Sequence, residues 1–381
     1  GWQVIQSMLA DYFTDTAADR DDALAASIKA SLGAVKAKKI VSLDTMGMAA
    51  ETAQNLSSEE RFMLDEWLKR HTPMKDRVFR NTRDTLRAYQ EAGIIPPDVT
   101  IPERHVTDEF IALDEWEQRL YDRIEEYIRQ YYNAYISNQS TQALGFIMTV
   151  YRRRLTSSFF AIRQSLKRRL HALEEGLTLG DLLADDDRAA LEEDTLFDVD
   201  DEGIRLDLLR GEIAELRNFV AELDQITGQD TKATQLINDL NEAFGSYSSV
   251  VVFTQYTDTM DYVRTRLVDA GYKQIGCYSG RGGELWNGHE WTRVSKEDIK
   301  TRFRDGDLHI LIGTDSMSEG LNLQTSGRLI NYEMPWNLMR AEQRAGRVDR
   351  IGATYPDIQV TNYFYAGTVE ETVYKGISED Y

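Results

Sequence analysis

The second half of the chain alternates strand-like and helix-like segments, and this alternation constrains the fold more than any other feature. Five short apolar runs read as strands with helical patterns between them: residues 249–254, 273–279, 308–313, 328–333 and 357–364. Strands separated by helices run parallel, because each right-handed crossover returns the chain to the same end of the sheet. We therefore predict an α/β lobe over residues 231–381, with helices on both faces of a parallel sheet.

Polar residues cluster at the ends of these predicted strands, where an open parallel sheet binds its ligands. Thr314 and Asp315 end the third strand, and Ser316 and Glu319 have capping-box spacing for a short helix whose amides could hold a phosphate. Gln255 and Tyr256 follow the first strand, and Ser279, Gly280 and Arg281 follow the second. Each position also has a purely structural reading, since Thr-Asp-Ser is an ordinary helix cap. The two tryptophans of 283–291 are placed in a loop, where they either stack on bases or pack over the loop.

A helix capped by Asn337 is predicted to run into the sequence QRAGRVDRIG, residues 343–352. On a 3.6-residue period Gln343, Arg347 and Arg350 fall within roughly 60° of one another, with Arg344 to one side. Guanidinium forks bind phosphate oxygens bidentately and stay charged, so this face suits phosphoryl transfer. The alternative is a solvated basic helix face.

The first 230 residues read as mainly helical. An amphipathic helix is predicted over 114–136, with others near 23–40 and 57–70, and the proline-containing segment 93–105 separates two helical regions. Residues 151–170 contain no acid and seven Lys or Arg, among them Arg152, Arg153 and Arg154. This stretch is either a surface that contacts phosphates or a helix whose positive charge balances the acidic residues 174–202. That acidic stretch is predicted to be a mobile or inserted segment.

Charge and cysteine content narrow the function classes. The net charge of −20, from 64 acidic and 44 basic residues, disfavours bulk attraction to nucleic acid, so local patches must carry any such binding. The single cysteine, Cys277, cannot form an internal disulfide, and the five histidines lack metal-ligand spacing, which predicts no metal site and a reducing, cytoplasmic compartment. No stretch has the roughly 18 apolar residues of a membrane helix.

Four motifs in this order resemble motifs IV, IVa, V and VI of superfamily 2 helicase-like ATPases: VVFTQYTDT (251–259), YSGRGG (278–283), ILIGTDSMSEGLNLQ (310–324) and QRAGRVDRIG (343–352). The sequence is most similar to the bacterial Swi/Snf-type branch, which includes RapA-like and DISARM-type DNA translocases. The resemblance implies a RecA-like helicase C-terminal lobe. It also implies ATP with Mg²⁺, double-stranded DNA, a first motor lobe of the same protein and partner proteins of a phage-defence or transcription complex.

The same resemblance implies roles for individual residues. Arg347 and Arg350 would be arginine fingers, Gln343 would contact the triphosphate, and Gly320 and Asn322 would lie against the nucleotide. Many relatives carry aspartate where Asn322 stands. DNA phosphates would be held by Thr314, Gln255 and the Ser279–Arg281 turn, with Asp315 beside them.

No glycine is followed by lysine, so the chain contains no GxxxxGK[ST] phosphate loop, and no DEAH-like strand end is found. We therefore interpret the sequence as the carboxyl part of a longer translocase that hydrolyses little or no ATP by itself. The predicted division is a helical tail of the first lobe (1–110), a helical linker or protrusion (111–230) and the second RecA-like lobe (231–381). Two alternatives are an ATP-independent protein-interaction module derived from a motor lobe, and a strand-separating or RNA-directed superfamily 2 helicase.

Overall fold

The computed structural model describes residues 83–136, 142–175, 211–226, 228–319 and 321–378. The chain divides into two compact units, Gly1–Tyr89 and Gln90–Tyr381, and all the strands described belong to the second. The helices expected near 23–40 and 57–70, and most of the acidic segment, lie outside the described residues.

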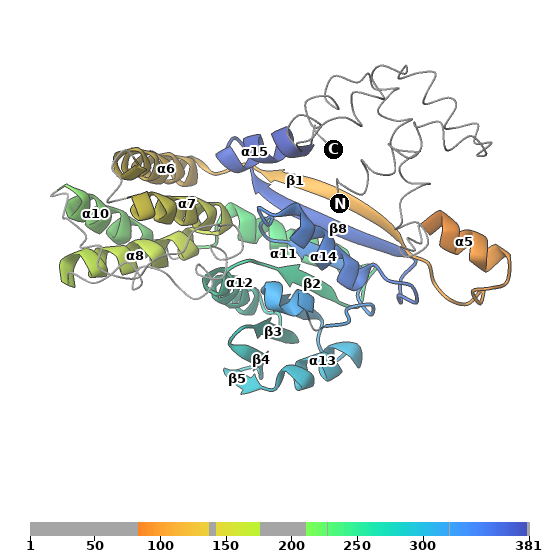
Figure 1. The fold of residues 1–381 in the computed structure, drawn as a ribbon. Helices are drawn as coiled ribbons and strands as arrows, with labels where there is room; N and C mark the ends of the chain where they lie inside the picture. The colour runs from red at the N-terminus through yellow and green to blue at the C-terminus, as the bar shows by residue number, and fades with distance from the viewer. Residues whose placement is uncertain (1–82, 137–141, 176–210, 227, 320, 379–381) are drawn as a thin grey trace, which may run out of the picture. The chain divides into compact units, whose positions relative to one another are not determined.

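An eight-stranded sheet forms the centre of the unit, in the order β1-β8-β7-β2-β6-β3-β4-β5 (Figure 1). The neighbours from β1 to β3 are all parallel, and only β3-β4 and β4-β5 are antiparallel. The five predicted strands are confirmed as β2 (Val250–Phe253), β3 (Ile275–Ser279), β6 (Ile310–Gly313), β7 (Arg328–Asn331) and β8 (Asp357–Tyr365).

Three strands were not predicted as strands. β1 (Glu103–Ile111) pairs with β8 over its whole length at one edge of the sheet. Its charged residues hide the alternation of a strand, and charges are common on exposed edges. β4 (Gly282–Trp286) and β5 (Trp291–Val294) form a hairpin where a loop was expected, and Trp286 and Trp291 pack on each other with their ring centroids 5.5 Å apart. The two tryptophans therefore pack on each other across the hairpin.

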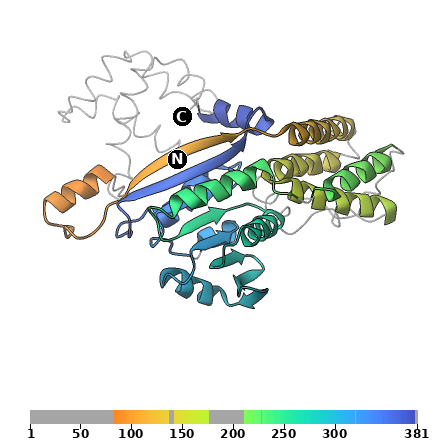
Figure 2. The ribbon, with the colours of Figure 1, turned by 180° about the vertical axis from the view of Figure 1, so that it is seen from behind.

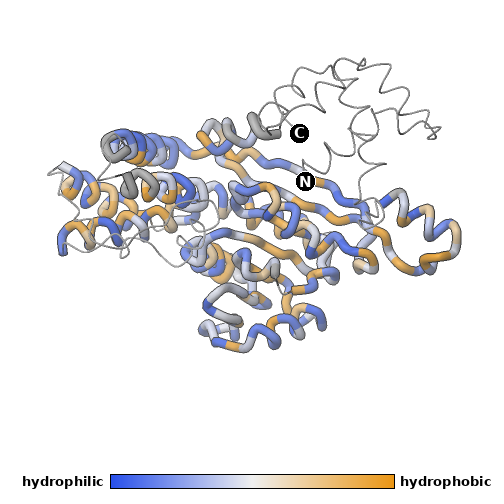
Figure 3. Tube along the Cα trace, in the orientation of Figure 1, coloured by the Kyte–Doolittle hydropathy of each residue, from blue (hydrophilic) through white to orange (hydrophobic). Residues whose placement is uncertain are grey.

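Helices cover both faces of the sheet, as the crossover argument requires. One face packs against α11 (Thr231–Ala243) and α12 (Thr257–Asp269), seen in front of the strands in Figure 2. The other packs against α13 (Lys296–Arg304), the 3-10 helix η4 (Asp315–Glu319) and α14 (Leu338–Val348). Val250 and Val252 face the first layer while Val251 and Phe253 face the second, which is the two-residue period of a strand. Figure 3 shows the central strands as the most apolar part of the trace. The fold is the predicted RecA-like α/β lobe.

A second hydrophobic core holds four helices together: α6 (Glu115–Ile136), α7 (Gln142–Ser157), α8 (Phe159–Glu175) and α10 (Glu212–Asp224). α6 confirms the helix predicted over 114–136. Inside this core Arg169 donates to Glu212 at 2.5 Å, and the Tyr127 hydroxyl donates to the same carboxylate at 2.8 Å. Two further helices, α5 (Arg83–Glu91) and α15 (Val369–Ser378), complete the described elements. None of the helices in the described ranges is both long and apolar enough to span a membrane.

Candidate nucleotide and nucleic-acid site

Helix α14 carries two of the residues predicted to bind the triphosphate, Gln343 and Arg347. Asn337 caps it as predicted, because its side-chain oxygen accepts from the Met339 amide at 2.9 Å. Gln343 is exposed and Arg347 half-buried. The prediction that Arg350 shares their helix face is wrong, because α14 ends at Val348. Arg350 lies past the end, and its Nε donates to the carbonyl of Gly346 at 3.0 Å, which satisfies one of the open carbonyls of the last turn.

Arg344, which the helical period sets to one side, is the residue that anchors α14 to the sheet. Its side chain is fully buried, and its Nε donates to Asp315 Oδ1 at 2.6 Å. Its Nη1 donates to Asn331 Oδ1 at 3.1 Å and to the carbonyl of Glu333 at 3.3 Å, at the end of β7. The guanidinium therefore joins three segments, and a buried charge of this kind requires such partners.

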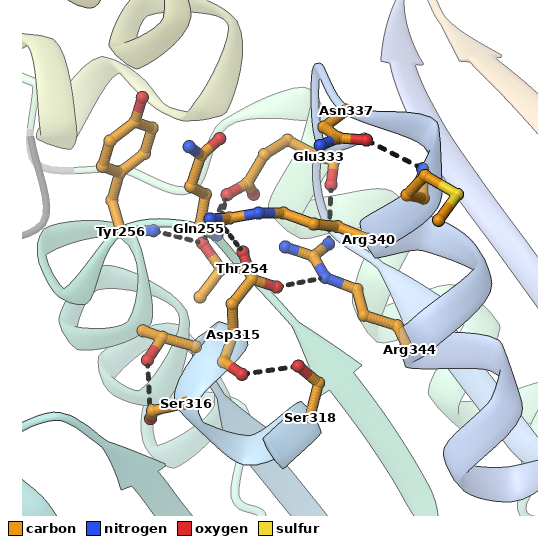
Figure 4. Close-up of polar contacts among 12 residues, drawn as sticks. Thr254, Gln255, Tyr256, Asp315, Ser316, Ser318, Glu333, Asn337, Arg340 and Arg344 are labelled. Carbon is orange, nitrogen blue, oxygen red and sulfur yellow. Dashed lines mark hydrogen bonds and ion pairs between the residues drawn. The ribbon is translucent and has the colours of Figure 1, made fainter. Parts of the chain in front are cut away.

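Asp315 holds a second arginine of α14, because Arg340 Nη1 donates to its Oδ2 at 2.9 Å (Figure 4). The four-residue spacing of Arg340 and Arg344 was a signal for this pair that the sequence reading did not use. The carboxylate predicted to lie in the nucleic-acid site thus binds two guanidiniums, and it fixes the position of α14 against η4.

The short helix after β6 differs in detail from the prediction. Ser316 does not cap it, because η4 already begins at Asp315, and the Ser316 hydroxyl lies 3.1 Å from the hydroxyl of Thr314. The Ser318 hydroxyl instead donates to the carbonyl of Asp315 at 2.6 Å. A five-residue 3-10 turn is too tight for the four-residue reach of a capping box.

The loop after η4 is fastened to the end of α14. The Leu323 amide donates to the carbonyl of Arg347 at 3.2 Å, and Gln324 Nε2 donates to the carbonyl of Ile351 at 3.1 Å. Asn322 is exposed, and its Nδ2 donates to Gln324 Oε1 at 2.7 Å. Two segments predicted to face the nucleotide therefore lie side by side, while Gly320 lies outside the described residues.

Glu333 organises the edge beyond β2. One carboxylate oxygen accepts from the Thr254 hydroxyl at 2.7 Å and from the amide of Gln255, which leaves the Gln255 side chain half-buried at the rim. Burial raises the pKa of Glu333 above its usual value. This effect outweighs the hydrogen bonds to the carboxylate and the charge of Arg344, which lower the pKa. Sequence reasoning did not single out this residue, although an acid directly after an apolar strand is a detectable signal.

The remaining strand ends carry two exposed residues, Gly280 and Arg281, and two buried ones, Ser279 and Thr314. Ser279 and Thr314 are buried, and the Ser279 hydroxyl accepts from the Arg281 amide at 3.2 Å. Gly280 is exposed at the turn. The Arg281 guanidinium binds Asp261 of α12 through two hydrogen bonds of 2.8 and 2.6 Å.

The basic stretch 151–170 pairs with acids that are distant in sequence. Arg152 binds Glu125 of α6 with nitrogen–oxygen distances down to 2.6 Å, and Arg153 lies over the ring of Trp336 at 5.5 Å. Arg154 is fully buried, 2.5 Å from Asp258 and 4.7 Å from the centre of the Tyr256 ring. The expectation that Arg154 contacts phosphate is therefore corrected: its guanidinium joins α7 to the start of α12. Within the part of the chain that the structure describes, acids on other helices pair with this stretch, and most of the acidic segment 174–202 lies outside the described residues.

Burial determines the chemistry of the single thiol. Cys277 is fully buried, and burial raises its pKa to about 12, so the reactive thiolate is suppressed at neutral pH. Among the described residues, no group of three or more His, Cys, Asp or Glu side chains is placed to hold a metal ion.

A family model for the helicase conserved C-terminal domain matches residues 232–352, which run from α11 to just beyond α14. Residues 232–352 are therefore similar to helicase C-terminal domains. This stretch includes every strand from β2 to β7 and the whole of α14. It excludes β1, β8 and the helices α6 to α10, so the domain uses strands from outside the matched region to complete its sheet.

Curated relatives match part of the chain. An uncharacterized ATP-dependent helicase, YqhH of Bacillus subtilis (strain 168), is 34% identical over 161 residues, which is 42% of this chain and 26% of that protein. The ATP-dependent RNA helicase DBP2 of Lodderomyces elongisporus is 29% identical over 136 residues, or 35% of this chain and 23% of its own length. The matched part of the chain therefore spans about a quarter of each relative.

Solved structures with a similar fold include the Pyrococcus furiosus Hef helicase domain, at 15% identity and a TM-score of 0.47 over 84% of this chain and 65% of that one. The C-terminal part of the Fun30 ATPase domain is 17% identical, with a TM-score of 0.44, over 72% of this chain and 89% of that one. The Sulfolobus solfataricus SWI2/SNF2 ATPase C-terminal domain is 11% identical, with a TM-score of 0.35, over 72% of this chain and 86% of that one. All three scores lie below 0.5, so they assign no branch of the superfamily.

Proposed function

We propose that this chain supplies the second motor lobe of an ATP-dependent double-stranded DNA translocase of Swi/Snf type. The observation that carries the proposal is the anchoring of α14. Arg344 and Arg340 bind Asp315, and the Leu323 amide binds the carbonyl of Arg347. Two motifs that resemble those of helicase motors are thereby held together at the rim of one parallel sheet, where such sheets bind their ligands.

In this proposal Arg347 and Arg350 are the arginine fingers, and Gln343 and Asn322 contact the nucleotide with Gly320. The Arg350 Nε is held by the carbonyl of Gly346 at 3.0 Å, and the guanidinium has two further nitrogens that can donate. A planar fork held on one side in this way suits bidentate binding of phosphate oxygens. Such arginines are worth about 10³ to 10⁵ in rate where they stabilise the charge of a transferring phosphoryl group. ATP with Mg²⁺ would be the substrate, shared with a first motor lobe.

Contacts to DNA are proposed at the ends of β2, β3 and β6. Gly280 is exposed, and Arg281 and Gln255 lie at the same rim. Ser279, Thr314 and Asp315 would act there mainly by fixing the turns, since each is held by contacts within the lobe. On the helical side, Arg152 and Arg153 keep part of their surface accessible and would add phosphate contacts.

A second candidate is an RNA-directed helicase of the same superfamily. It is favoured by one observation: the relatives of this chain include an RNA helicase that is 29% identical over 136 residues. The proposal for double-stranded DNA rests instead on the likeness of 251–352 to the Swi/Snf-type motifs. A partner-binding module without ATP turnover is the third reading, and the same experiment addresses it.

The test uses the full-length protein. ATP hydrolysis is measured with double-stranded DNA, single-stranded DNA or RNA of equal length, and triplex displacement is compared with duplex unwinding. We expect stimulation by duplex DNA and displacement of a third strand without unwinding. Arg347→Ala should abolish the stimulated hydrolysis and leave DNA affinity nearly unchanged, whereas Arg119→Ala, at an exposed position of α6, should leave both unchanged. Stimulation by RNA alone, or full turnover by Arg347→Ala, refutes the proposal.

A further inference from the structure

Strand β1 reaches the sheet from a part of the chain far from α14, yet its start is fastened to the end of that helix. The Gly352 amide donates to the carbonyl of Thr100 at 2.8 Å, and the Glu103 amide donates to the carbonyl of Pro356 at 2.7 Å. The segment that leads into β1 is therefore bonded to the loop that follows the proposed arginine finger Arg350.

Arg104, the second residue of β1, makes the most specific of these contacts. Its Nη1 and Nη2 donate to the two carboxylate oxygens of Glu342 at 3.0 and 3.1 Å, in the bidentate arrangement that only a guanidinium can make. Its Nε lies 3.8 Å from Asp349 Oδ2. Glu342 directly precedes Gln343, and Asp349 directly precedes Arg350. One side chain therefore contacts α14 beside the proposed triphosphate contact and at the end that carries the proposed finger.

This contact is not needed to hold β1 in the sheet. β1 already pairs with β8 over the full length from Glu103 to Ile111. The ion pair leaves the sheet and joins the two walls of a groove of about 380 Å³, with Arg104 and Val106 on one wall and Leu338, Met339 and Glu342 on the other. On this side α14 is separated from β1 by open volume, so the polar contact sets the distance between the helix and the strand.

The bidentate pair is partly exposed, because Arg104 and the more distant Asp349 are largely buried whereas Glu342 is not. The side chains of Arg104 and Asp349 are 21% and 10% exposed, while Glu342 is 67% exposed. Exposed pairs contribute little to stability, with a median of about 0–1 kcal/mol. A bidentate guanidinium held between two carboxylates instead fixes geometry, because its planar fork permits few orientations.

We infer that Arg104 is a positioning residue that sets α14, and with it Gln343, Arg347 and Arg350, for phosphoryl transfer. This inference rests on the proposed function. In this inference Arg104 acts by holding the helix from the strand that enters the lobe, a role that requires no contact with nucleotide or DNA. Small displacements of reacting groups are costly, since an error of about 1 Å can lower a rate by about 100-fold. A displacement of the residues before β1 would be transmitted through Arg104 to α14 and its arginines.

The test measures kcat and KM for DNA-stimulated ATP hydrolysis in the full-length enzyme, with DNA affinity and the unfolding temperature of each variant. Arg104→Gln and Glu342→Gln should each lower kcat on the order of tenfold, with DNA affinity and unfolding temperature unchanged. The double variant should be no slower than either single one, because both remove the same contact. Arg104→Lys should remain slow, since an ammonium cannot bind both oxygens of Glu342.

The matched control is His105→Gln, which removes the neighbouring exposed pair of His105 Nε2 with Asp357 Oδ1 at 3.2 Å on the other face of the strand. It should keep wild-type kcat. A normal kcat in Arg104→Gln, or a loss that follows a fall in unfolding temperature, overturns the inference, and so does full rescue by lysine. If Arg347→Ala itself retains turnover, the proposed function fails first, so the two failures are distinguishable.

Discussion

Replacing Arg344 by alanine should destabilise the lobe more than any exposed arginine substitution. The side chain is fully buried and donates to Asp315 at 2.6 Å, to Asn331 at 3.1 Å and to the carbonyl of Glu333 at 3.3 Å. It also lies 5.2 Å from the centre of the Phe253 ring. Alanine removes all of these contacts, so the oxygens of Asp315, Asn331 and Glu333 lose the guanidinium that donates to them.

The magnitude follows from these contacts. Removing one partner of a buried ion pair costs about 3–5 kcal/mol, because the other charge stays buried without compensation. Asp315 is 21% exposed and keeps Arg340 at 2.9 Å, which places the loss near the lower end of that range, at about 3 kcal/mol. Arg344→Lys should recover little, because a single ammonium cannot reach both Asp315 and Asn331 with the same geometry.

Urea unfolding of the 381-residue chain, followed by circular dichroism, measures the free energy of unfolding and its slope. The control is Arg304→Ala, at the end of α13, where the guanidinium is exposed and pairs with Asp305 at 2.9 Å. It should leave the unfolding curve close to that of the wild type. A loss below about 1 kcal/mol for Arg344→Ala, with an unchanged slope, would refute the claim that Arg344 anchors α14.

Three further predictions follow from burial and close approach. Burial raises the pKa of Glu370 to about 7, so the folded state holds this proton more tightly than the unfolded state does. The free energy of unfolding should therefore fall as the pH rises from about 4.5 to 7. Denaturation of Glu370→Gln, measured at each pH, should show a weaker dependence on pH. A Cβ on Gly313 would lie 2.7 Å from the carbonyl of Tyr278, so Gly313→Ala should lower the unfolding temperature, whereas Gly211→Ala, with open space around it, should not. Cys277 should react with a thiol reagent only after unfolding, and fast labelling of the native chain would contradict its burial.

The sequence was most informative where local pattern and tertiary environment agree. Runs such as Val250–Phe253 are apolar at every position because both faces of the strand are covered, so they are visible as buried strands. β1 was not recognised, since an edge strand with the sequence ERHVTDEFI has few buried positions and reads as a polar connection. The hairpin β4-β5 was hidden by its glycines and by tryptophans that pack on each other.

Charged residues were read less well, because their partners lie far away in the chain. Arg152, Arg154 and Arg169 look like one basic patch in sequence, yet they bind Glu125, Asp258 and Glu212. Periodicity alone could not distinguish a solvated arginine from a buried one. Each pairing depends on which helices pack together, and spacing along one helix does not contain that information.

The sequence by itself determined a parallel α/β lobe, the position of α14 and the set of polar residues at the strand ends. Apolar period, helix caps and strand spacing act over a few residues, so they can be read from the order of amino acids. Only the tertiary structure decided that Arg344 is the buried anchor, that Arg350 lies beyond the helix and that Arg104 contacts both ends of the proposed site. These outcomes depend on desolvation and on contacts between segments up to 245 residues apart, from Arg104 to Asp349, which become defined when the sheet is assembled.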